Sequence, residues 1–132
     1  MNRALINQLR KLAGERCDYC RMPERLDPLP FQVDHIIAQQ HGGATIFENL
    51  AWSCLHCNKH KEPNIAGVDP ESGELAALFH PRRQVWRRHF FWDGSVLRGR
   101  TRAARATIAV LGINLLDFVA FRAQLIEEGV WR

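Results

Sequence analysis

The sequence predicts an α+β fold whose core is a two-stranded hairpin followed directly by a helix. Apolar residues recur at Phe31, Val33 and Ile36, which indicates a strand, and residues 50–52 indicate a second short strand. Residues 54–61 have the pattern of a helix start. This order brings the strand ends beside the first turns of the helix, so polar residues there are the first candidates for a functional site.

A short amphipathic helix is expected before this core. Leu5, Leu9 and Leu12 recur at helical spacing, which predicts a helix over residues 2–13. Gly14 follows where a helix commonly ends in a left-handed residue.

The second half of the chain is expected to begin with a connector and a hairpin. Residues 62–73 are interrupted by proline and glycine and are expected to contain no regular element. Asp93 and Gly94 lie between two apolar runs, which predicts a tight turn between two strands.

A pair of helices is expected at the C-terminus. Thr101 can cap a helix that Gly112 ends, and Asn114 can begin a second helix that ends before Gly129. Arg122 interrupts the apolar stripe of the second helix.

We expect one domain over residues 1–132, because neither half is large enough to form a stable core easily alone. It would comprise an N-terminal helix (residues 1–16), the core (residues 17–61) and a basic extension (residues 62–132). The formal charge of +4 permits nucleic-acid binding. No apolar run approaches membrane-spanning length and the N-terminus lacks the apolar segment of a signal peptide, so we expect a cytoplasmic protein without membrane contact.

The four cysteines form two Cys-x-x-Cys pairs, which predict one zinc site. The pairs are Cys17 with Cys20 and Cys54 with Cys57. In a reducing compartment, doubled pairs of this spacing favour tetrahedral structural zinc over disulfides. The gap between the pairs is longer than in a simple zinc ribbon. Unrelated thiols or a redox pair are the alternatives, but no βαβ pattern flanks either pair.

The segment FQVDHIIAQQHGGATIFENLAWSCLHCNKHK, residues 31–61, resembles the HNH nuclease family, whose active unit is a ββα-metal finger. The resemblance is specific over residues 17–61. The matching positions are Asp34-His35, Gly42-Gly43, Asn49-Leu50, Cys54-x-x-Cys57-Asn58 and Lys61. The tail also looks like the C-terminal part of a group of small bacterial HNH proteins. An α+β fold with a zinc-finger-like ββα-metal core, flanking helices and an additional C-terminal hairpin and helical pair is therefore expected.

The resemblance implies a role for each polar residue of the hairpin. His35 would be the general base, since a near-neutral imidazole is well matched to take a proton from water. Asn49 would hold the loop after His35 through side-chain hydrogen bonds. Asp34 and Asn58 would be oxygen ligands of a catalytic divalent metal. A helix-capping amide is the alternative for Asn58.

The asparagine at position 58, where many family members have histidine, favours Mg²⁺ or Mn²⁺ as the catalytic metal. The reaction implied by the resemblance is hydrolysis of DNA to 5′-phosphate and 3′-hydroxyl products. One such site would nick a single strand, whereas a homodimer could cut both.

Between residues 75 and 116, eight arginines accompany a single acid, Asp93. Because guanidinium groups suit bidentate phosphate contacts, we expect a nucleic-acid-binding surface there, with a solvated basic face as the alternative. The expected nucleic-acid contacts are Lys59, Lys61, Arg82, Arg83, Arg87 and Arg88.

Two function classes follow from these patterns. The first is a metal-dependent endonuclease acting on DNA, with RNA as the alternative substrate and a homodimer or a targeting protein as further partners. The second is an inactive zinc-stabilised module that binds nucleic acid. A redox or interaction protein that uses its cysteines has the least support.

Overall fold

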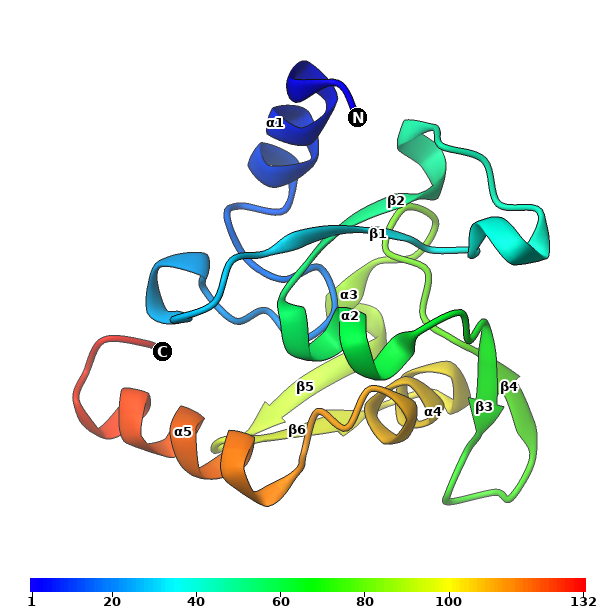
Figure 1. Cartoon of the computed structure of the whole chain (residues 1–132). Coiled ribbons are helices and arrows are strands. Elements are labelled where there is room, and N and C mark those ends of the chain that lie inside the picture. Colours follow the sequence, from blue (N-terminus) through cyan, green and yellow to red (C-terminus); the bar gives the residue numbers. More distant parts are fainter. The chain divides into compact units, whose positions relative to one another are not determined.

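The computed structural model describes all residues, 1–132, and its strands pair into three two-stranded antiparallel sheets (Figure 1). The predicted α+β class is confirmed. The chain forms two compact units: residues 1–65 with residues 80–84, and residues 66–79 with residues 85–132. None of its helices has both the length and the apolar character that a membrane span requires.

The first unit begins with helix α1 (Arg3–Leu12). The Asn2 side chain caps it by accepting a hydrogen bond from the Ala4 amide at 2.6 Å. Gly14, with φ at +68°, follows the helix end, as predicted. Leu9 is completely buried, and α1 packs on strand β2 through this face.

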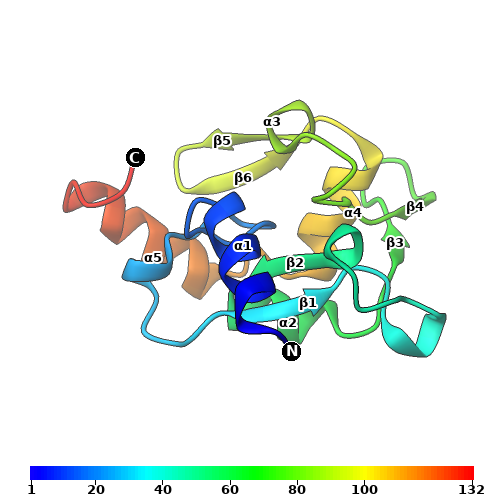
Figure 2. The same cartoon turned by 90° about the horizontal axis from the view of Figure 1, so that it is seen from above.

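The predicted hairpin and helix form the centre of the first unit. Strands β1 (Gln32–His35) and β2 (Leu50–Ser53) pair with His35 opposite Leu50 and Gln32 opposite Ser53. Helix α2 (Leu55–Lys61) begins directly after β2. Helices α1 and α2 lie on opposite faces of the hairpin, which leaves all four residues of β2 buried (Figures 1 and 2). Three 3₁₀ turns lie in the loops: η1 (Glu24–Leu26), η2 (Gln39–His41) and η3 (Phe47–Asn49).

The second unit contains two hairpins and three helices. Strands β3 (Ala66–Val68) and β4 (Leu75–Ala77) form the first hairpin, and β5 (Phe90–Asp93) and β6 (Val96–Gly99) form the second. The helices are α3 (Trp86–His89), α4 (Arg102–Val110) and α5 (Leu116–Glu127). The predicted turn at Asp93-Gly94 and the Thr101 cap of α4 are both present.

Strand β3 corrects the prediction that residues 62–73 contain no regular element. Its pairing with β4 and its packing on α4 are tertiary interactions that outweigh the local proline and glycine pattern. Gly67 permits the close approach of α4, since a Cβ atom there would lie 2.4 Å from a methyl carbon of Val110. The turn is closed by Asp69, whose carboxylate accepts hydrogen bonds from the Glu71 amide at 3.0 Å and the Ser72 hydroxyl at 2.7 Å.

Helix α5 begins two residues later than predicted because Asn114 has another role. Its side chain accepts a hydrogen bond from the Leu97 amide and donates one to the Leu97 carbonyl, at 3.0 and 2.7 Å. Arg122, the arginine within the apolar stripe, is buried and donates to the backbone carbonyls of Ser95 and Ile113. The buried guanidinium of Arg122 therefore has hydrogen-bond acceptors within the second unit.

The Asp69–Arg105 ion pair makes the stability of the second unit dependent on pH. Asp69 is fully buried, and two hydrogen bonds from Arg105, at 2.9 and 3.0 Å, hold the pKa of its carboxyl well below the usual 3.8. A depressed folded-state pKa contributes stability that is present above the unfolded-state pKa and is lost as the pH falls below it.

We therefore expect Asp69→Asn to lower Tm at pH 7 and to flatten the decline of Tm between about pH 5 and pH 2. Asp93→Asn, which changes an exposed carboxylate paired with Arg98 in the same unit, is the matched control. Thermal unfolding followed by circular dichroism measures both. If Tm falls with pH equally in the wild type and in Asp69→Asn, the ion pair is not the source of the pH dependence.

Candidate active site and metal centre

Four buried cysteine side chains from two segments converge at the base of the finger. The sulfur atoms of Cys17, Cys20, Cys54 and Cys57, here called the four-cysteine cluster, all lie within 4.8 Å of one another, and none forms a disulfide. The Cys20 and Cys54 sulfurs are 3.8 Å apart. Zn–S bonds of about 2.3 Å in a tetrahedron place sulfurs about 3.8 Å apart, so the cluster has the dimensions of a tetrahedral zinc site with four thiolate ligands.

The surroundings of the sulfurs also fit a bound cation. Backbone amides donate to two of them: Tyr19 N–H to Cys17 at 3.4 Å and Cys57 N–H to Cys54 at 3.3 Å. Hydrogen bonding with Cys17 raises the pKa of Cys54 and Cys57 well above the usual range for a thiol. Four adjacent thiolates are therefore unfavourable by themselves, and a divalent cation provides the compensating charge.

His35 lies at the end of β1, with its ring directed to the following loop. Its Nε2 is 2.9 Å from the hydroxyl of Thr45, and Gln39 donates to the same hydroxyl at 3.3 Å. The ring is half-exposed. This contact restrains the imidazole through Nε2, and Nδ1 is the ring nitrogen that does not contact Thr45.

Asn49 holds the backbone of the loop that follows His35. Its amide accepts a hydrogen bond from Ile37 N–H and donates to the carbonyls of Ile37 and Ala44, all at 2.9 Å. The buried side chain thereby joins the two ends of the loop, the arrangement that the sequence predicts for it. Gly43 is necessary at the same place, since a Cβ atom would lie 1.7 Å from the Ile37 oxygen.

Asp34 lies in a different environment from its neighbour His35. Adjacent side chains of a strand project from opposite faces, and Asp34 faces α2. Its Oδ2 accepts a hydrogen bond from the Tyr19 hydroxyl at 2.7 Å and is 3.3 Å from the ammonium of Lys61. The Asp34 and Lys61 side chains are 5% and 1% exposed, so this is an internal ion pair. Burial raises the pKa of the Asp34 carboxyl, and Lys61 opposes the increase.

Asn58 lies on the same side of β1 as Asp34. Its amide nitrogen donates to the side-chain oxygen of Gln32 at 2.7 Å, which leaves its own oxygen as an acceptor. Gln32 and Asp34 alternate onto one face of β1, so β1 and α2 bring the oxygens of Asp34 and Asn58 to one interface. The structure thus places Asp34 and Asn58 on the side of β1 that faces α2, whereas His35 contacts Thr45 in the following loop.

The oxygen donors at this interface suit a hard divalent cation. A carboxylate and an amide are the ligand types that Mg²⁺ and Mn²⁺ prefer. In this structure, however, the Asp34 carboxylate forms an ion pair with the Lys61 ammonium. The same ammonium donates a hydrogen bond to the His35 carbonyl at 3.1 Å. A divalent ion at Asp34 would therefore compete with Lys61.

Two of the expected nucleic-acid contacts are buried instead. Lys61 pairs with Asp34, and the Arg82 side chain, 7% exposed, pairs with Asp18 at 2.8 Å and lies over the ring of Phe47. Both cations neutralise internal carboxylates, which corrects their assignment to the binding surface. The other four expected contacts are exposed: Lys59, Arg83, Arg87 and Arg88.

Sequence reasoning missed three partners of the site. Tyr19 lies inside the first cysteine pair and Thr45 in the loop, and neither position has a pattern that indicates a contact with Asp34 or His35. Lys61 was identified, but with a solvent-exposed role. Its place at the last position of α2, one turn after Asn58, was the available indication that it faces β1.

The first unit thus combines a ββα finger, a four-cysteine cluster and a histidine at the end of a strand. Residues 17–64 match the family model described as HNH endonuclease. The resemblance found in the sequence is confirmed over the cluster, the hairpin and α2. No curated protein and no solved structure matches the chain.

Removal of metal from the four-cysteine cluster is expected to unfold the first unit. Cys57→Ser should lower the zinc content below one ion per chain and lower Tm by more than about 10 °C, because short strands depend on the metal for stability. Elemental analysis and circular dichroism measure both effects. Chelation followed by addition of Zn²⁺ is the control, and an unchanged melting curve after chelation would contradict the assignment.

Proposed function

We propose that the protein is a metal-dependent HNH endonuclease that hydrolyses phosphodiester bonds of DNA, with zinc in the four-cysteine cluster. The observation that supports this most is His35, held at the end of β1 by Thr45 within a loop that Asn49 closes. Such an orientation is needed for a general base and has no evident value in a purely structural finger.

His35 would take the proton of the attacking water. In the tautomer whose Nε2–H donates to Thr45, Nδ1 is unprotonated and would be the atom that accepts the proton. Asn49 would act as a positioning residue, since it fixes the backbone on both sides of the loop without reaching the reacting atoms. Lys61 would fix the same strand end through the His35 carbonyl.

Asp34 and Asn58 would hold the catalytic divalent ion, Mg²⁺ or Mn²⁺. When bound, such an ion stabilises negative charge on the phosphate and its leaving oxygen. The exposed side chains of Lys59, Arg83, Arg87 and Arg88 would neutralise phosphates of the bound strand. A cytoplasmic location follows as an expectation from the sequence.

The first experiment measures nicking of supercoiled plasmid by the zinc-loaded protein in Mg²⁺ and then in Mn²⁺. We expect His35→Ala to lower the nicking rate by about 10²–10⁴-fold, the usual contribution of a general base, with DNA binding unchanged. His41→Ala, which removes an exposed histidine of the same loop, is the matched control. Nicking by His35→Ala at the wild-type rate would contradict the proposal.

A second candidate function is an inactive nucleic-acid-binding module, and one observation favours it. The Asp34–Lys61 ion pair satisfies the carboxylate without a metal. Wild-type protein that binds DNA in a salt-dependent way but does not nick it in either metal would establish this function instead.

Lys61→Met tests whether lysine and a divalent ion compete for Asp34. The variant leaves a buried carboxylate unpaired, so we expect stability to fall by about 3–5 kcal/mol without metal and Mn²⁺ affinity to rise. Lys59→Met, with the same charge change on an exposed position of α2, is the control. Free Mn²⁺ measured by electron paramagnetic resonance reports binding directly, and equal Mn²⁺ affinity in the two variants would contradict competition.

A further inference from the structure

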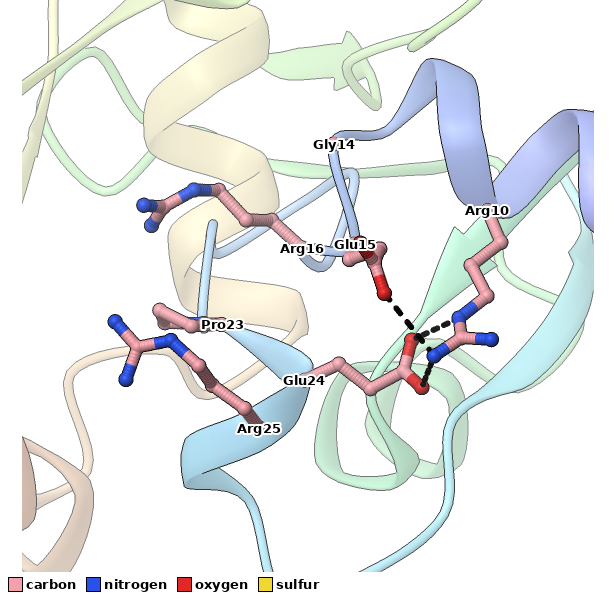
Figure 3. A pocket seen from close by; sticks show the side chains of 7 residues that line it. All are labelled: Arg10, Gly14, Glu15, Arg16, Pro23, Glu24 and Arg25. Atoms are coloured by element: carbon pink, nitrogen blue, oxygen red, sulfur yellow. Dashed lines mark hydrogen bonds and ion pairs between the residues drawn. The ribbon is translucent and has the colours of Figure 1, made fainter.

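A basic groove lies beside the first cysteine pair, away from His35 and Asp34 in sequence. One part of it is a pocket of about 260 Å³ lined by Arg10, Gly14, Glu15, Arg16, Pro23, Glu24 and Arg25 (Figure 3). Figure 3 shows the Arg16 and Arg25 side chains extending in the same direction, away from the two glutamates. The pocket belongs to none of the elements assigned to catalysis.

Both glutamates of the pocket form hydrogen bonds or ion pairs with neighbouring side chains. Glu24 accepts hydrogen bonds from Arg10 at 3.0 Å and from the indole of Trp52 at 2.8 Å, and Glu15 pairs with Arg10 at 3.1 Å. Arg10 therefore forms ion pairs with both glutamates. Arg16 and Arg25 add two further positive charges at the other side of the pocket.

Arg16 lies close to both Arg21 and Arg25. Arg16 donates to the backbone carbonyl of Arg21 at 3.3 Å. Arg16 and Arg25 line the same pocket. Like charges so placed repel one another, and an anion bound between them reduces that repulsion.

Arg21 occupies a backbone position where glycine would be easier to accommodate. Its φ is +64°, in the left-handed region that a side chain rarely adopts. This residue follows Cys20 directly, so its side chain starts beside the first cysteine pair.

The shape of the groove favours a polymer over a single small ion. A second pocket of about 290 Å³ shares Arg10, Gly14 and Glu15 with the first and extends along α1 to Lys11. Each pocket is below the range of about 300–1,000 Å³ typical of small-molecule sites. The cationic lining residues of the two adjoining pockets are Arg10, Lys11, Arg16 and Arg25, a series that suits successive phosphates of a strand.

We propose that Arg16 and Arg25 form a phosphate-binding site for the backbone of the bound nucleic acid, separate from the catalytic centre. The identity of the polymer rests on the proposed function, but the site acts in binding and takes no part in hydrolysis. Contacts with phosphates position the strand but do not distinguish one base sequence from another.

The test is binding of a short fluorescent DNA duplex, measured by anisotropy without added divalent metal. Arg16→Gln with Arg25→Gln is expected to weaken binding about tenfold and to reduce the slope of log affinity against log salt by about 2. The control, Arg3→Gln with Arg132→Gln, removes the same charge from exposed arginines outside the pocket and outside residues 75–116, and should change affinity less than about twofold.

Wild-type affinity in the Arg16 and Arg25 variant, or an equal loss in the control, would overturn the proposal. Arg16→Lys with Arg25→Lys keeps the charge and should keep the wild-type salt slope, and a slope as low as that of the glutamine variant would also overturn it. Saturable binding of inorganic phosphate with unchanged DNA affinity would assign the site to free phosphate instead. Zinc content confirms that each variant is folded, and because the assay does not measure cleavage, failure of the nuclease proposal is detected separately.

Discussion

The convergence of four sulfur atoms is the constraint on which the first unit depends. Strands of four residues cannot form a stable hairpin alone, and the finger has only two of them. The cluster joins residues 17–20 to the start of α2, so one metal ion would fix the knuckle, the end of β2 and the direction of the helix together. The metal would therefore also determine where β1, which contains His35, and α2, which contains Asn58, lie in the first unit.

Internal ion pairs provide the second set of constraints. Asp34 with Lys61 and Asp18 with Arg82 each place a carboxylate and a cation out of contact with water. Such pairs contribute little net stability compared with apolar packing, but loss of one partner is costly. Burial raises the pKa of Asp18 to about 6, and Arg82 opposes the increase. The pairs therefore favour one arrangement of the unit over others.

Much of the fold was predictable because its information is local. Alternation, glycine positions and helix caps indicated the hairpin, α1, α2, α4 and the turn after β5, and doubled cysteine spacing indicated the cluster. Strand β3 was missed because it depends on pairing with β4. The roles of Lys61 and Arg82 were missed because charge alone does not show which basic residues face buried carboxylates, and the contacts of Thr45 and Tyr19 depend on tertiary structure in the same way.

Residues 80–84 have a consequence for how this finger could be transferred between proteins. They belong to the first unit although the segments on both sides belong to the second, and Arg82 among them is the ion-pair partner of Asp18. A recombination event that joined residues 1–65 to another sequence would separate Asp18 from its cation and leave the carboxylate beside the cysteine cluster unpaired. Transfer of residues 1–65 without residues 80–84 is therefore disfavoured, and the two units are expected to be inherited together.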